Sequence, residues 1–174
     1  MQNIFLIGYM GAGKTTIGKQ IAKCLGWPFV DMDLFIENRY HKTVPDIFAE
    51  KGEEFFRKIE HLILQEVAQF ENTVISTGGG TPCFLDNMDL MNRTGITVYL
   101  KLPVSELMRR LSANKHERPL IKDKNTEELK QFIIDSLEKR EMWYSRAGIV
   151  FNSSDESIHT IVAYLIKQIN EKQT

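Results

Sequence analysis

Eight consecutive residues near the N-terminus have the composition and spacing of a phosphate-binding loop. Residues 8–15 read GYMGAGKT, a complete G-x-x-x-x-G-K-[ST] pattern that follows an apolar run and opens a helical pattern. The glycines let the backbone curl so that successive N–H groups point at phosphate oxygens, and the positive end of the helix faces the same point. An ordinary glycine turn is the alternative, and the complete motif in this context disfavours it. The pattern therefore predicts a nucleoside triphosphate site.

Two side chains of this loop have separate expected tasks. Lys14 is expected to bridge the β- and γ-phosphates of ATP and to be catalytic, and the Thr15 hydroxyl is expected to ligate Mg²⁺. The residues of the loop and helix start that we expect to bind the nucleotide are Gly11, Ala12, Gly13, Lys14, Thr15 and Thr16.

Two carboxylates close the next apolar run. Asp31 and Asp33 follow Phe29 and Val30, and on a strand residues i and i+2 point the same way, so both are expected to face the ligand. Phosphoryl transfer needs one acid to hold Mg²⁺ or its water shell, and one to accept a hydrogen bond from the attacking hydroxyl. We expect Asp31 to hold the metal, through water, and the residues alone leave the second task open. The alternative, that one of the pair only caps the following helix, is disfavoured by their place at a strand end.

A glycine triplet, residues 78–80, follows the third apolar run at 73–76. Three glycines at the carboxyl end of a strand allow a ligand to approach backbone N–H groups closely, at the edge where parallel sheets bind ligands. A regulatory GTPase would carry an N-K-x-D guanine motif, whereas residues 114–117 read NKHE, and an ATPase motor would end this strand in an acid. These observations favour a kinase.

The elements that position these residues alternate along the chain. Short apolar runs predict strands at 4–7, 29–30, 73–76, 96–100 and 149–151. Helical patterns lie between them at 15–25, 34–40, 45–70 (broken near Gly52), 85–92, 104–111, 126–145 and 157–171. Strands separated by helices of this length indicate an α/β fold with a parallel sheet. The long polar segment 112–125 is expected to be a functional lid.

Composition bounds the class of protein. The chain has 174 residues, 43% hydrophobic and 26% charged, which predicts one domain, residues 1–174, with a real core. A net charge of −1 provides no general attraction for nucleic acid or an anionic membrane, and two cysteines exclude a disulfide scaffold. No apolar stretch approaches the roughly 18–20 residues that span a bilayer, and the N-terminus has no basic signal-peptide region. We therefore expect a cytoplasmic protein that is a monomer.

Taken together, six motifs resemble the shikimate kinase family in order and spacing, from residue 4 to about residue 151. They are GYMGAGKT at 8–15, FVDMD at 29–33, IFAEKGEEFFR at 47–57, TGGG at 77–80, RPL at 118–120 and KREMWY at 139–144. The resemblance implies a three-layer α/β/α P-loop kinase of the nucleoside-monophosphate-kinase type. It implies five parallel strands in order 2-3-1-4-5, an acceptor-binding region at about 32–60 and a mobile lid at about 112–125. The implied reaction is ATP-dependent phosphorylation of shikimate to shikimate 3-phosphate, a step toward the aromatic amino acids.

The resemblance also implies roles for single residues. Asp33 matches the proposed base that hydrogen-bonds the shikimate hydroxyls, Arg118 matches a catalytic lid arginine over the phosphates, and Arg110 matches a position near the adenine. The positions that match those holding shikimate are Arg57, Gly78, Gly79, Gly80 and Arg140. A planar guanidinium is suited to a carboxylate, which it binds through two parallel hydrogen bonds. Glu60, one helical turn after Arg57, is expected to orient it.

The sequence also gives expectations for the burial of several apolar residues. Phe48 and Phe56 either line the ring face of shikimate or belong to the core, whereas Phe55 is expected to be buried. Cys24 is expected to pack inside the fold, and Cys83 to be partly exposed. Residues 152–154 lack the arginine or proline that relatives place against adenine, which leaves the adenine clamp open.

The sequence leaves two alternatives to a shikimate kinase function. One is another small-molecule P-loop kinase of the gluconate kinase type, which we would not expect to combine Arg57 with the RxxxY pattern at 140–144. The other is a nucleotide-binding switch without catalysis, which would not need the Asp31 and Asp33 pair.

Overall fold

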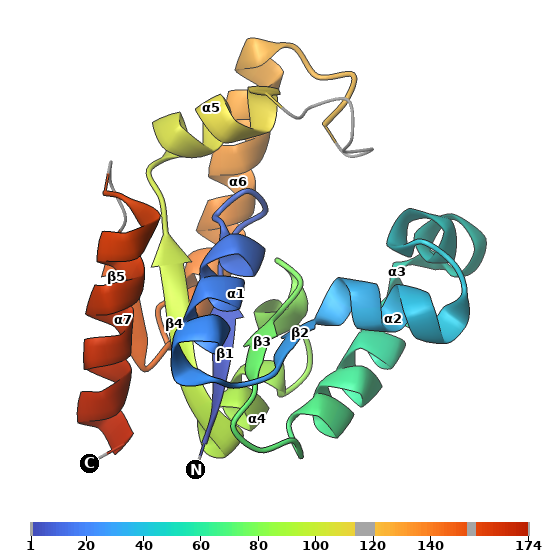
Figure 1. The fold of residues 1–174 in the computed structure, drawn as a ribbon. Coiled ribbons are helices and arrows are strands. Elements are labelled where there is room, and N and C mark those ends of the chain that lie inside the picture. Colours follow the sequence, from blue (N-terminus) through green and yellow to red (C-terminus); the bar gives the residue numbers. More distant parts are fainter. Residues whose placement is uncertain (1, 114–120, 153–155, 174) are drawn as a thin grey trace.

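Five parallel strands form the centre of the molecule (Figure 1). The computed structural model describes residues 2–113, 121–152 and 156–173. The strands are β1 (Asn3–Ile7), β2 (Phe29–Asp31), β3 (Val74–Ser76), β4 (Gly95–Lys101) and β5 (Ile149–Asn152). They are ordered β2-β3-β1-β4-β5, and every neighbouring pair is parallel. This order confirms the predicted sheet.

Helices cover both faces of the sheet. They are α1 (Lys14–Leu25), α2 (Met32–Tyr40), α3 (Val44–Val67), α4 (Asn87–Thr94), α5 (Val104–Ala113), α6 (Thr126–Tyr144) and α7 (Ile158–Gln173), with a short 3₁₀ helix η1 (Thr81–Cys83). The central strand β1 is buried along its whole length and alternates between two apolar clusters. Ile4 and Leu6 pack with α1, α5 and α7, whereas Phe5 and Ile7 pack with α2, α3 and α4. Residues of the same strand therefore join the three layers.

The helix bounds follow the predicted ones within a few residues, and α3 does break at Gly52, whose φ of 79° is not helical. The sequence did not predict η1. No helix among the described residues is long and apolar enough to cross a membrane. The predicted lid at 112–125 includes residues 114–120, which lie outside the described residues, so the lid stays a prediction.

Two burial predictions were wrong. Phe55 is 39% exposed while Phe56 is 2% exposed, because the buried stripe of α3 runs through Phe56 and Ile59 and leaves Phe55 on the solvent side. Cys24 is also exposed, since Ala22 is the last buried residue of α1. Cys83 is partly exposed, as expected.

Candidate active site

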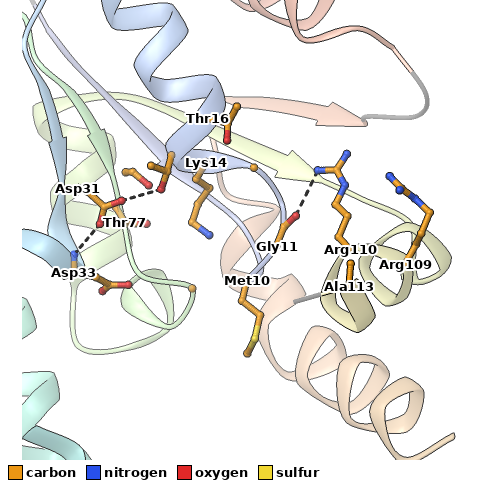
Figure 2. A pocket seen from close by; sticks show the side chains of 14 residues that line it. Met10, Gly11, Lys14, Thr16, Asp31, Asp33, Thr77, Arg109, Arg110 and Ala113 are labelled. Carbon is orange, nitrogen blue, oxygen red and sulfur yellow. Dashed lines mark hydrogen bonds between the residues drawn. The ribbon is translucent and has the colours of Figure 1, made fainter. Parts of the chain in front are cut away.

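A cleft of about 600 Å³ lies at the carboxyl edge of the sheet (Figure 2). Its volume is within the usual range for small-molecule sites. The residues that line it are Met10, Gly11, Gly13, Lys14, Thr15, Thr16, Asp31, Asp33, Ser76, Thr77, Gly79, Arg109, Arg110 and Ala113. The ends of β1, β2 and β3 thus meet the start of α1 and the last turns of α5 in one depression.

The phosphate loop, residues 8–15, forms one wall. Gly11 and Gly13 have φ angles of 80° and 93°, a left-handed conformation that strains any other residue, and Gly13 caps α1. The Lys14 ammonium donates hydrogen bonds to the carbonyls of Gly8 at 2.8 Å and Tyr9 at 3.0 Å, so it lies over the curl of the loop. Ala12 is buried and does not line the cleft. The loop has the shape that the motif predicts.

Thr15 and Asp31 meet beside this loop. The Thr15 hydroxyl donates to Asp31 Oδ2 at 2.8 Å, while Asp31 Oδ1 accepts the N–H groups of Asp33 at 3.2 Å and Leu34 at 3.4 Å. Asp31 therefore caps α2 and also faces the phosphate loop, so the two interpretations of this residue do not compete.

The same oxygens suit a magnesium ion. The described residues hold no group of three or more His, Cys, Asp or Glu side chains able to bind a metal. Mg²⁺ commonly takes only one or two protein oxygens and completes its shell with water and substrate phosphates. The hydroxyl of Thr15 and the carboxylate of Asp31 fit that pattern.

Asp33 lines the cleft as predicted, but it belongs to a helix rather than to the strand. The strand ends at Asp31 and α2 begins at Met32, so Asp33 lies in the first turn of a helix and the two-residue strand periodicity does not apply. Burial raises the pKa of Asp33 to about 6, and the negative charges of Asp31 and Glu60 add to the effect while Lys14 opposes it. A carboxyl group with this pKa can gain or lose a proton near neutral pH.

The glycine loop, residues 78–80, is packed so closely against its neighbours that side chains would not fit there. A Cβ at Gly78 would lie 2.8 Å from Glu60 Oε1 and 3.2 Å from Asp33 Oδ1. A Cβ at Gly79 would lie 3.4 Å from an Arg140 nitrogen, and one at Gly80 only 2.6 Å from an Arg57 nitrogen. The loop therefore brings the predicted acceptor residues of α2, α3 and α6 to one place.

Arg57 is held by several partners. It donates to Glu60 Oε2 at 2.9 Å and to Glu53 Oε1 at 3.1 Å, and its guanidinium carbon lies 4.1 Å from the centroid of the Phe84 ring. Glu60 is only 1% exposed, and its other oxygen accepts the Thr81 hydroxyl at 2.6 Å. The expectation that Glu60 orients Arg57 is confirmed. Because Thr81 belongs to the unpredicted η1 and Phe84 follows it, no sequence motif indicated either contact.

Arg140 and Arg110 each lie beside a residue of the phosphate loop. The guanidinium of Arg140 lies 5.4 Å from the centroid of the Tyr9 ring. Arg110 donates a hydrogen bond to Glu106 at 2.6 Å. It also donates one to the carbonyl of Gly11 at 3.4 Å, as Figure 2 shows. Arg118, the predicted lid arginine, lies outside the described residues.

Other lining residues carried no signal in the sequence. Met10 occupies a variable position of the phosphate motif, and Arg109 and Ala113 come from the same end of α5 as Arg110. Phe56 belongs to the core rather than to the cleft wall. Phe48, partly buried, stacks on it with ring centroids 4.4 Å apart.

A phosphate loop that opens onto a carboxyl group of raised pKa, with two guanidinium groups gathered at a glycine loop beyond it, defines a P-loop kinase for a small anionic acceptor. The shikimate kinase family model matches residues 10–170. A shikimate kinase from Parabacteroides distasonis is 54% identical over 96% of this chain and 99% of its own. The chain belongs to the shikimate kinase family.

Solved structures agree with this assignment. The crystal structure of shikimate kinase from Bacteroides thetaiotaomicron has a TM-score of 0.92 and 50% identity, covering 97% of this chain and 98% of its own. Shikimate kinase from Acinetobacter baumannii, in complex with shikimate, has a TM-score of 0.90 and 33% identity, covering 99% of this chain and 94% of its own. The similarity therefore includes both fold and sequence.

Proposed function

We infer that this protein phosphorylates shikimate at the expense of ATP and forms shikimate 3-phosphate. The observation that supports this beyond family membership is the meeting of Asp33, Arg57 and Arg140 at the glycine loop, next to the phosphate loop. Shikimate is a ring with one carboxylate and several hydroxyls. A site for it needs cationic groups for the carboxylate and an acceptor for the attacking hydroxyl's proton.

The arginines supply recognition of the carboxylate. Arg57 and Arg140 bind it through charge-assisted hydrogen bonds, which are stronger than neutral ones. The glycine loop supplies backbone groups close to the ring, because Gly78, Gly79 and Gly80 carry no side chain to exclude it. With a net charge of only −1, the chain offers no general attraction for an anion, so this local charge determines the acceptor.

Asp33 supplies the base. At neutral pH a carboxyl group with a pKa of about 6 is mostly ionised and is more basic than an ordinary aspartate. The shikimate hydroxyl oxygen attacks the γ-phosphorus, the bond from that phosphorus to the bridging oxygen of ADP breaks, and Asp33 takes the hydroxyl proton. The carboxylate thus increases the nucleophilicity of an otherwise weak alcohol.

The phosphate loop and its neighbours hold the nucleotide. Backbone N–H groups of the loop and the Lys14 ammonium stabilise the charge on the transferred phosphoryl group. We propose that Arg110 lies near the adenine and that Arg118, which is outside the described residues, acts on the phosphates. Thr15 and Asp31 would hold Mg²⁺, Asp31 through water, and the ion supplies charge neutralisation on the phosphate oxygens.

We also propose that the protein acts as a monomer on a small molecule, with no nucleic acid or membrane partner, because its net charge of −1 gives no general attraction for either. The cytoplasmic location predicted from the sequence fits a reaction that uses ATP.

A coupled assay of ADP release tests the function. The purified protein is incubated with ATP, Mg²⁺ and, in separate reactions, shikimate, gluconate or a nucleoside monophosphate. Of the three acceptors, we expect only shikimate to support ADP release. Turnover with gluconate instead would support the other kinase type, and ADP release independent of every acceptor would support a nucleotide-binding switch.

A further inference from the structure

Tyr144, the last residue of α6, contacts the acceptor site without a task in the reaction above. It follows Arg140 by four residues, so the two side chains share one face of the helix. Its side chain is fully buried, and its ring stacks on that of Tyr99 with centroids 4.9 Å apart. Its hydroxyl donates a hydrogen bond to the carbonyl oxygen of Gly79. A core tyrosine therefore reaches the glycine loop.

The direction of this hydrogen bond determines what else the hydroxyl can do. A carbonyl oxygen only accepts, so the phenolic proton points at Gly79 and the lone pairs of the phenol oxygen remain for another donor. The Arg140 guanidinium lies near this phenol, and it also lies beside Gly79, whose carbonyl accepts the phenolic proton. Burial raises the pKa of Tyr144, although Arg140 lowers it, so the phenol keeps its proton at neutral pH.

Arg140 and the glycine loop are thereby fixed relative to each other. A Cβ at Gly79 would lie 3.4 Å from an Arg140 nitrogen and 3.5 Å from the Gly8 carbonyl oxygen, so this glycine lies between the arginine and the phosphate loop. The ring of Tyr144 is already buried by its neighbours, so a phenylalanine would fill the same space. The hydroxyl therefore contributes to the orientation of the glycine loop and of Arg140, not to the filling of space.

We propose that the Tyr144 hydroxyl is a positioning group for the acceptor, one that holds the Arg140 guanidinium in register with Gly79. The inference rests on the proposed function, because Arg140 is taken to bind the shikimate carboxylate. A shift of about 1 Å in such a group is enough to reduce turnover when the substrate must be aligned for attack.

Tyr144→Phe removes the hydroxyl and keeps the ring, and Tyr99→Phe is its matched control. Tyr99 is also buried and belongs to the same stacked pair, but its hydroxyl donates to Glu141 at 2.9 Å rather than to the glycine loop. We expect Tyr144→Phe to lower kcat/KM for shikimate roughly 3- to 10-fold, the effect of losing one hydrogen bond, with KM for ATP changed less than about twofold. Tyr99→Phe should stay within about twofold of wild type on both measures.

The Arg140→Ala background separates positioning from general structure. If the hydroxyl acts through Arg140, Tyr144→Phe should cost less than about twofold in that background. An equal loss in both backgrounds would overturn the proposal, as would a Tyr144→Phe enzyme indistinguishable from Tyr99→Phe. Loss of folding in Tyr144→Phe alone, seen as a collapse of its melting temperature, would also overturn it by assigning the hydroxyl a structural role. A wild-type enzyme inactive on shikimate would instead overturn the proposed function itself.

Discussion

The nucleotide half and the acceptor half of the candidate active site are built in opposite ways, and Arg57 and Arg140 of the acceptor half lie beyond the residues that line the cleft. The centre of the nucleotide half is one continuous segment, the phosphate loop and the start of α1, beside which α5 places Arg110. The contacts of this segment are mainly backbone groups set by glycine conformations. The acceptor half draws Asp33 from α2, Arg57 from α3, the glycine loop from the end of β3, and Arg140 from α6. Its contacts are mainly charged side chains held by other side chains.

This difference predicts different responses to mutation. Backbone N–H groups remain in place when a side chain changes, so a substitution in the nucleotide half removes one charge and leaves the cradle intact. In the acceptor half the buried Glu60 is neutralised by Arg57 and bound by Thr81, so a substitution there affects both binding and folding. Changes to the nucleotide half should therefore appear in kcat, and changes to the acceptor-side arginines in kcat/KM for shikimate and in stability.

The largest effect is expected for Lys14→Met. Its ammonium is the cation of the phosphate loop, and its loss should lower kcat by about 10³-fold or more because the transferred phosphoryl group loses charge stabilisation. The melting temperature should change little, since the side chain faces the cleft. Steady-state kinetics and thermal melting measure the two. Lys23→Met, an exposed change on the same helix, is the control and should leave kcat unaltered. A Lys14→Met enzyme with near-normal turnover would contradict the nucleotide assignment.

Asp33→Asn should follow, with kcat lower by roughly 10²- to 10⁴-fold, the usual contribution of a general base. The pH profile gives the sharper test. Because the pKa of Asp33 is raised to about 6, kcat/KM of the wild type should fall as the pH drops below about 6 and the carboxylate becomes protonated. The variant should lose this limb. If the variant kept the same acid limb, another group would be the base.

Arg57→Lys tests the acceptor half. Lysine keeps the charge but loses the planar fork, so kcat/KM for shikimate should fall roughly 10- to 150-fold, corresponding to about 1.5–3 kcal/mol for a charged hydrogen bond. The Kd for ATP should stay within about twofold. Arg39→Lys is a matched control, because Arg39 also pairs with a glutamate, Glu66, but at an exposed position on α2. Weakened ATP binding with intact shikimate kinetics would place Arg57 in the nucleotide half and contradict the division into two halves.

The same contrast explains what the sequence alone could predict. The phosphate loop was predicted in full, because its function depends on residues adjacent in the chain. Arg57 and Arg140 were assigned only through resemblance to a family, since nothing in the local sequence indicates that they meet. The geometric argument for Asp33 was wrong because the helix begins one residue after Asp31, which periodicity cannot locate. The contact between Thr81 and Glu60 depends on packing of η1 against α3 and has no sequence pattern.

The last expected effect is a gain in stability rather than a loss of activity. The raised pKa of Asp33 means that the folded state disfavours its charge relative to the unfolded chain, whose pKa is near 3.8. Below about pH 4 the group is neutral in both states and has no cost. As the pH rises through 4 to 6 the unfolded state ionises first, so the wild type loses about 2–3 kcal/mol of stability, and the loss is complete above about pH 6.

Asp33→Asn should therefore unfold at a higher urea concentration than wild type at pH 7.5, and the gap should narrow at pH 4. Asp46→Asn is the control, since Asp46 also lies in the first turn of a helix but is exposed. That change should destabilise slightly at pH 7.5, because a negative charge near a helix N-terminus is favourable. Opposite signs for the two variants would show that the acceptor half keeps its base in an unfavourable setting, whereas equal signs would attribute the effect to the helix end alone.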